Sequence, residues 1–434
     1  MSDHRAAAPS VLIIWILLGM SCTTVSPAAE GQATWVDRAE MTRPRLFHFA
    51  GVGSDGRIAA VAGKVAIKPN NGTVPGVGDR ALDIYDPETN TWKQGPAAPD
   101  YVGIRRKYVI YHDPTNRDKV LSEGVEEYPF KMRHDWEYVP GVGGRDGRIY
   151  WFSKRGPIYF DPAANMWGQG EPVLYDYDAE RYTPPVANWF RLAGATAAGP
   201  DGKLYLVGGT GYPTIVGSKK GEPYRVLDSI EIYDPATRTW KEGTKMVLPR
   251  QMMAAAFAPD GKLYVFGGFA ALGTHVKLPD ESDARFAARV RLDDRFARGA
   301  LRFVQAYDPA TDTWEDRAPM PAGRQSMGAA LGADGRIYVI GGADQYSNPA
   351  PKAEVFIYDP KMNTWSEGPP LNHPRYHHAV VATPDGRIWA IGGTNGTNRW
   401  GALPRGEEEG LVRPIEMLET RPVLPMPSTP EQPR

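Results

Sequence analysis

The stretch Asp260-Gly-Lys-Leu-Tyr-Val-Phe-Gly-Gly268 decides the fold, because the same pattern recurs along the chain. A variable gap then leads to Tyr-Asp-Pro or Phe-Asp-Pro, and a tryptophan follows six residues after that aspartate. The Asp-Gly pairs begin at Asp55, Asp146, Asp201, Asp260, Asp334 and Asp385. The tryptophans are Trp92, Trp167, Trp240, Trp314 and Trp365. Self-similarity at a period of roughly 50 residues or more predicts a solenoid, a propeller or another array.

Each repeat predicts four short strands, as residues 249–314 illustrate. A small apolar run at 251–258 leads into the tight turn at Asp260-Gly261, since Asp-Gly supplies the positive φ angles of a hairpin. A β-branched and aromatic strand follows and ends at the glycine pair. The alternating segment 303–307 and the segment beginning at Thr313 complete the unit. Four-stranded sheets repeated around an axis form a β-propeller.

The repeats resemble those of the kelch family. The resemblance covers about residues 35–420 and includes an arginine before each first strand. Its glycine pairs begin at Gly208, Gly267, Gly341 and Gly392. The first two repeats depart from the family pattern, with Ala62-Gly63 and Ser153-Lys154 at this place.

The two ends of the chain are expected to share one blade. The chain has six Asp-Gly turns but only five internal Asp-Pro…Trp units, and the sixth repeat has Glu419 where the aspartate belongs. The missing tryptophan segment is Thr34-Trp35 at the other end. Because an unclosed ring exposes strand edges, we expect residues 34–38 to be the outer strand of the last blade. The prediction is an all-β, six-bladed propeller over 34–420, followed by a proline-rich tail at 421–434.

The N-terminal segment predicts export. Residues 11–20 form an apolar run that is short for a membrane span and typical of a signal-peptide core, so we expect a signal peptide over 1–28. Cys22, the single cysteine, follows this run and resembles a bacterial lipoprotein lipidation site, although Leu18 stands one position too early. Periplasmic, lipid-anchored outer-membrane and secreted locations stay open, as does an uncleaved anchor. The net charge of −1 argues against a nucleic-acid partner.

The expected insertions all fall on one face of the ring, which we call the long-loop face. The turns on the other face are the short Asp-Gly and Asp-Pro turns. The insertions are 64–80, 210–228, 269–302, 343–352 and 394–413 within blades, and 94–133 and 168–189 between blades. Residues 281–298 suggest a short helix with Phe286 and Val290 on one side. Residues 101–138 mix aromatic and cationic residues, which suits the binding of sugars or acidic groups, or a small core under a long loop. Long loops on a rigid scaffold usually carry function, although insertional drift is the alternative.

A repeated arginine predicts an anion site at the mouth of the ring on this face. Its copies lie ten residues before the aspartate of their turns: Arg45, Arg191, Arg250, Arg324 and Arg375. Trp136 takes the equivalent place in blade 2, and Tyr376 adjoins the last arginine. Guanidinium groups suit bidentate capture of carboxylate, sulfate or phosphate. The resemblance implies two uses for this arginine: pairing with backbone carbonyls or an acid, and contact with acidic peptides.

Two histidines are candidates for proton transfer. His48 and His378 each follow a repeated arginine by three residues, in blades expected to be neighbours. Tyr138 and Tyr376 are further candidates. Together with His377, the histidines His48 and His378 also suggest metal ligation, but no closely spaced ligand set is evident. The alternative is that histidine at this position belongs to the family pattern.

Three function classes therefore remain. The first is an exported monomeric propeller that binds an acidic small molecule, glycan or peptide without a cofactor. The second is an epimerase, mutarotase or lyase acting on an acidic sugar, and the resemblance extends to propellers that epimerise sialic acid. Copper-radical oxidation is excluded because its Cys–Tyr crosslink requires a cysteine outside the signal segment. The third is a purely structural interaction protein.

Overall fold

A computed structural model provides the structure, in which two compact units are Met1–Gln32 and Ala33–Arg434. The first unit, with Cys22, lies outside the described residues. The described residues are 33–46, 48–61, 63–65, 81–99, 101–113, 116–132, 141–153, 156–169, 174–176, 181–183, 189–213, 225–270, 282–284, 287, 299–345, 349–396 and 411–420. Of these, the side chains of 64–65, 101–132, 153, 156, 174–183, 189–190, 212–213 and 225 are not described. None of the described residues belongs to a helix with the length and hydrophobicity needed to cross a membrane.

Six antiparallel four-stranded sheets form the blades, as the repeat predicts. Blade 1 has β3 (Phe49–Val52), β4 (Ile58–Val61), β6 (Leu82–Asp86) and β7 (Thr91–Gln94). Blade 2 has β10 (Gly141–Gly143), β11 (Ile149–Ser153), β12 (Gly156–Asp161) and β13 (Met166–Gln169). Blade 3 has β17 (Ala195–Ala198), β18 (Leu204–Val207), β21 (Ile230–Asp234) and β22 (Thr239–Gly243).

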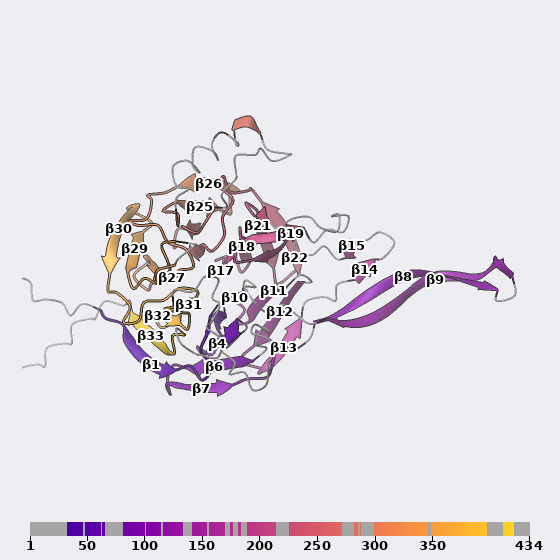
Figure 1. The fold of residues 1–434 in the computed structure, drawn as a ribbon, viewed down its shortest axis with the longest axis horizontal. Helices are drawn as coiled ribbons and strands as arrows, with labels where there is room; N and C mark the ends of the chain where they lie inside the picture. The colour runs from indigo at the N-terminus through magenta and orange to yellow at the C-terminus, as the bar shows by residue number, and fades with distance from the viewer. Residues whose placement is uncertain are drawn as a thin grey trace, which may run out of the picture. The chain divides into compact units, whose positions relative to one another are not determined.

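The remaining blades repeat this order from the axis outward. Blade 4 has β23 (Ala254–Phe257), β24 (Leu263–Phe266), β25 (Val304–Asp308) and β26 (Thr313–Asp316). Blade 5 has β27 (Gly328–Leu331), β28 (Ile337–Ile340), β29 (Val355–Asp359) and β30 (Thr364–Gly368). Blade 6 has β31 (Ala379–Ala382), β32 (Arg387–Ile391), β33 (Pro414–Glu419) and β1 (Val36–Glu40). The innermost strands contact one another in a closed cycle from β3 through β31 and back, which is the ring in Figure 1.

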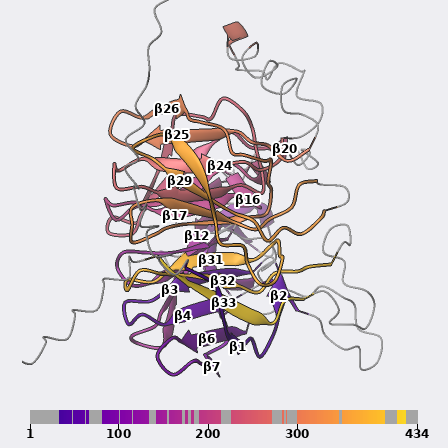
Figure 2. The same ribbon diagram turned by 90° about the vertical axis from the view of Figure 1, so that its left-hand side faces the viewer.

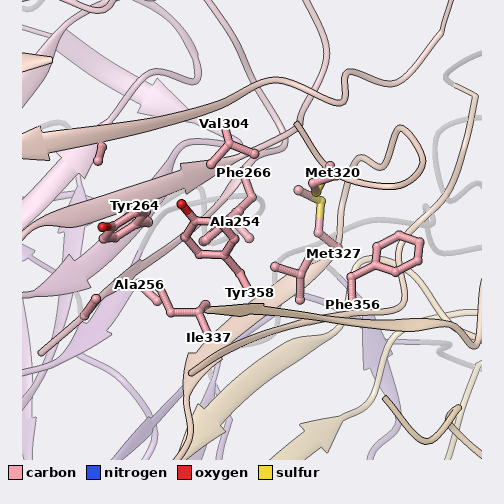
Figure 3. Close-up of a cluster of buried hydrophobic side chains, with 13 residues drawn as sticks. Ala254, Ala256, Tyr264, Phe266, Val304, Met320, Met327, Ile337, Phe356 and Tyr358 are labelled. Atoms are coloured by element: carbon pink, nitrogen blue, oxygen red, sulfur yellow. The ribbon is translucent and has the colours of Figure 1, made fainter. Parts of the chain in front are cut away.

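The hydrophobic core is divided among the gaps between blades. Figure 3 shows one such gap, where Tyr264 and Phe266 of blade 4 meet Ile337 and Tyr358 of blade 5. The Tyr264 and Tyr358 ring centroids lie 5.4 Å apart. Small residues of the first strand, such as Ala254, let the blades narrow towards the axis. Because each gap holds side chains from two blades, no blade completes its core alone.

The Asp-Gly turns join the first and second strands of each blade as the sequence predicts, but only the glycine of each pair has a positive φ angle. At Gly261 the backbone φ is +79°, which a residue without a Cβ adopts readily. One carboxylate oxygen of Asp260 accepts the Lys262 amide at 3.1 Å, and the other accepts the Tyr264 hydroxyl at 2.8 Å. The turn therefore also positions a core tyrosine.

The predicted closure of the ring is confirmed. β1 pairs antiparallel with β33, placing Val36 opposite Met417 and Asp37 opposite Glu416. The strand covers 36–40 where the sequence suggested about 34–38. Trp35 is buried and donates its indole N–H to the Pro369 carbonyl of blade 5 at 2.9 Å. Blade 6 thus contains strands from both ends of the chain.

The two inter-blade insertions contain strands that the sequence reading missed. β8 (Tyr101–Asp113) and β9 (Asn116–Met132) form a long hairpin that projects from the ring in Figure 1. β14 (Leu174–Asp176) runs parallel to β8 and pairs with β15 (Arg181–Thr183). Among the described residues of the expected helix, Asp283, Ala284 and Ala287 are helical, and Phe286 and Val290 lie outside the described residues.

Replacing Trp35→Ala is expected to destabilise the whole ring by about 3–5 kcal/mol, because a buried indole is removed from the closing strand. Chemical denaturation should measure this loss. Val36→Ala, at a neighbouring position that is 45% exposed, is the control and should cost below about 1 kcal/mol. An unchanged midpoint for Trp35→Ala would show that β1 does not contribute to ring stability.

Candidate functional site

The two faces of the ring differ, as the loop lengths predict. Short strands outside the blades extend the long-loop face, and Figure 2 shows β2, β16 and β20 together at one side of the edge-on ring. β2 (Arg45–Leu46) pairs with β5 (Lys64–Val65). β16 (Trp189–Leu192) pairs with β19 (Thr210–Pro213), which pairs in turn with β20 (Arg225–Val226). These ribbons raise a rim around the start of the first strands.

A channel of about 1080 Å³ lies between the six first strands. Glycine and alanine form much of its wall, in agreement with the small residues of these strands. His48, Met253, Met327 and His378 line it at the long-loop end. Ser54, Gly147, Pro200, Pro259 and Pro384, from the short turns, line its other end.

The five repeated arginines lie inside the blades, which corrects the expectation of open guanidiniums around the mouth. Arg45, Arg250 and Arg375 are 0% exposed, Arg191 is 1% exposed and Arg324 is 4% exposed. Arg250 donates to the carbonyls of Gly267 and Phe303 at 3.2 and 3.3 Å. Arg375 likewise donates to Gly392 and Pro414. The guanidiniums of Arg191, Arg250 and Arg375 thus bridge the second and third strands of their own blades.

Buried polar partners on the third strand complete these contacts. Arg45 pairs with Asp83, Arg191 with Glu231, and Arg375 with Glu416 at 2.6 Å. Arg250 instead meets the neutral amide of Gln305 at 3.1 Å. Burial lowers the pKa of Arg250 to about 9, with Asp316 partly offsetting the shift, so the side chain stays charged at neutral pH. Arg324 stacks on Phe356 and lies 3.4 Å from the half-exposed Glu354.

A signal for these partners was present in the sequence and was missed. In four blades an acid or amide stands at the same third-strand position, two residues before the tyrosine of Tyr-Asp-Pro or its equivalent Leu418. These residues are Asp83, Glu231, Gln305 and Glu416. The repeated arginine and this position form a pair that recurs with the blades, which indicates a structural role.

Backbone hydrogen bonds join neighbouring blades at the mouth. The second glycine of each pair donates to the arginine carbonyl of the following blade. These bonds are Gly209 to Arg250 at 2.7 Å, and Gly268 to Arg324, Gly342 to Arg375 and Gly393 to Arg45 at 2.9 Å. Two residues after the arginine, Ala193, Met252, Ser326 and His377 have φ between 52° and 56°. The amides of the last three donate to the same position in the preceding blade, which links the mouth residues in series.

His48 and His378 reach the same end of the channel, but as buried wedges between blades. They are 8% and 7% exposed, and their ring nitrogens have no hydrogen-bond partner among the described residues. Burial is the main cause that lowers the pKa of both, to about 3 for His378, with Arg375 adding to the effect. Neutral imidazoles whose nitrogens are covered are poorly placed for proton transfer.

The other candidate residues divide into two groups. Tyr376 is 2% exposed, and its hydroxyl donates to the Gly396 carbonyl at 3.0 Å, so it stabilises the rim. Trp136 and Tyr138 lie outside the described residues. No group of three or more His, Cys, Asp or Glu suited to a metal ion occurs in the described part of the chain.

Comparison with known proteins identifies the repeat. The family model described as the Kelch motif matches residues 191–247 and 326–372. Mouse Kelch-like protein 35 is 28% identical over 42% of this chain and 32% of its own length. Alpha-scruin of Limulus polyphemus is 26% identical over 47% of this chain and 24% of its own. Human Kelch repeat and BTB domain-containing protein 12 is 28% identical over 45% of this chain and 29% of its own length. The alignments therefore span about a quarter to a third of these relatives.

Replacing Arg375→Met is expected to cost about 3–5 kcal/mol of folding stability, because Glu416 is left buried without its cation. Arg387→Met, which breaks a partly exposed contact to Asp385 in the same blade, should cost below about 1 kcal/mol. Equilibrium denaturation measures both. Equal stability of the two variants would contradict a structural role for the repeated arginine.

Proposed function

The chain belongs to the kelch-repeat family, and we propose that it is a binding propeller whose long-loop face holds a segment of another protein. The observation that carries the proposal is the one-sided extension of the ring. The ribbons β2–β5 and β16–β19–β20 both build on this face, whereas Asp-Gly turns occupy the other. Binding residues commonly lie on loops that a rigid scaffold positions.

The rim is well suited to recognition because hydrogen bonds to neighbouring blades hold its backbone in place. Hydrogen bonds between blades hold the arginine carbonyls, and the positive-φ residues are linked in series. A preorganised surface loses little conformational entropy when a partner binds.

A protein segment fits this face better than a small acid held by the five arginines. At three of these arginines an acid would have to displace a buried carboxylate, that of Asp83, Glu231 or Glu416. The other two, Arg250 and Arg324, are 0% and 4% exposed. An acidic preference would instead depend on other cations near the rim. Arg302 precedes the third strand of blade 4 and is exposed, and Arg43 and Arg413 are partly exposed. We propose that these three favour an acidic segment.

Catalysis is not part of the proposal, because the candidate imidazoles are covered and neutral. Export remains part of it. The apolar run at 11–20 supports a signal peptide, and Cys22 supports lipidation as one form of export. The match to kelch-repeat proteins supports the binding role, whereas the proposal of export rests on the N-terminal sequence alone.

The binding proposal is tested by selecting peptides from a display library on the immobilised propeller and mapping their footprint by hydrogen exchange. We expect protection at 43–46, 189–192 and 210–213, with enrichment of Asp and Glu among the selected sequences. Arg302→Glu should weaken binding about tenfold, equivalent to 1.4 kcal/mol.

Lys203→Glu, at the short-turn face, makes the same charge change and should leave affinity within about twofold. A footprint confined to the Asp-Gly turns would refute the assignment of the face. Selected sequences without acidic enrichment would refute only the acidic preference.

A further inference from the structure

The histidines whose side chains are described lie around the blade that closes the ring. Four histidines have described side chains, and all of them border blade 6. They are His48, His373, His377 and His378. Blade 6 is also the blade that joins β1 to β33. The imidazoles in the described part of the chain therefore gather where the ring is closed.

Two of these histidines fill the gaps on either side of blade 6. A Cβ added to Gly392 would lie 2.7 Å from His48 Cε1, and one added to Gly341 would lie 3.0 Å from His378 Cε1. His48 therefore packs from blade 1 onto blade 6, and His378 packs from blade 6 onto blade 5.

Methionine takes the equivalent position in the blades farther along the ring. Met253 Cε lies against Gly208 and Met327 Cε against Gly267 in the same geometry. An apolar thioether therefore suffices for packing at this position. The imidazoles at the seam add a group that can acquire charge.

The surroundings of the two imidazoles oppose a positive charge. His48 faces Arg45, His378 and Arg375, and His378 faces Arg375. The carboxylates of Asp83 and Glu416 are already bound to these two arginines. On the blade 5 side, Lys352 pairs with Asp344 at 2.8 Å. The carbonyls of Arg45 and Ile340 are the groups that favour the charged form, and burial outweighs them.

The outer end of blade 6 responds differently. His373 Nε2 lies 3.0 Å from Asp37 Oδ2 and so ties β1 to the connection before β31. Burial acts to raise the pKa of Asp37, but hydrogen bonds from Asn372 and His373 hold it below its ordinary value. Because the pKa of Asp37 lies below its ordinary value, this carboxylate stays ionised at about pH 5.

We propose that blade 6 is an acid-sensitive gate at the long-loop mouth: protonation of His48 and His378 parts its inner end from blades 1 and 5, while β1 stays attached. Opening would break the hydrogen bond that the His377 amide donates to the Ser326 carbonyl at 3.0 Å, which links blades 5 and 6. His377 itself stacks on Tyr376 at 4.6 Å on the rim. The proposal does not depend on what the long-loop face binds.

The direction of the pH dependence follows from linkage. Both pKa values are lowered in the closed ring, so an open state binds more protons once the pH falls below the ordinary histidine value of about 6.5. Stability of the closed state is complete above that pH. Below that pH, the equilibrium constant for opening rises by up to about tenfold per pH unit for each histidine. The rise ends when the pH reaches the lowered pKa of that histidine.

Hydrogen exchange on the full chain tests the gate at about pH 7.5 and about pH 5, after correction for the intrinsic exchange rate. Protection of β31, β32 and β3 amides should fall at least about tenfold more than that of β23 and β24 in blade 4. The variant His48→Met/His378→Met copies blades 4 and 5 and should abolish the difference. His373→Gln, outside the channel, should retain it.

Equal loss of protection in all blades, or the same pH dependence in the double methionine variant, would overturn the proposal. NMR titration of the unmodified protein covers the case in which the double variant does not fold. Imidazole signals of His48 and His378 should remain neutral down to about pH 5 in the closed ring. Titration of both near about pH 6.5 without any opening would also overturn it.

Discussion

The hydrogen bond from the second glycine of each pair to the arginine carbonyl of the next blade is the contact on which the mouth of the ring depends. Both glycines have positive φ, and a Cβ on either would approach the neighbouring backbone or side chain within 3 Å, as at Gly267 and Gly268. The contact thus explains the glycine pair by conformation and by space. It also fixes the arginine backbone, so that the side chain turns inward to the third strand.

The buried ion pairs follow from this arrangement. The guanidiniums of Arg191, Arg250 and Arg375 satisfy carbonyl groups where the second and third strands diverge towards the long-loop face. A carboxylate balances the charge of Arg45, Arg191 and Arg375. Replacing a whole buried pair by apolar groups is often neutral for stability, whereas removing one partner is costly. Blade 4 shows that the carboxylate is dispensable, because Gln305 accepts the hydrogen bond from Arg250 in its place. The Gln305 side-chain amide in turn donates a hydrogen bond to Asp316 at 3.1 Å. The arginines therefore hold strands in register.

Local sequence patterns predicted the ring well, because blade number, turn chemistry and closure all depend on spacing along the chain. The repeat located the six Asp-Gly turns, and the missing sixth tryptophan located β1 near Trp35. The direction of the repeated arginine side chains could not be predicted from such local patterns. A constant offset shows that Arg45 and Arg375 occupy equivalent places, but the direction of a side chain depends on partners such as Asp83 and Glu416 in distant strands. The pairing of β14 with β8 joins two insertions from different blade junctions, which no local pattern reports.

Joining the first strand to the last blade makes completion of the fold a late kinetic event. The Trp35 contact with Pro369 spans 334 residues, so it cannot form until nearly the whole chain has been synthesised. Bringing together the ends of so long a flexible segment costs about 5 kcal/mol beyond a constant, although preformed blades shorten the effective loop. During translation the earlier blades would present an unpaired flank, which is the surface that chaperones protect and that aggregation exploits. High contact order of this kind predicts slow folding for a ring whose individual hairpins form quickly.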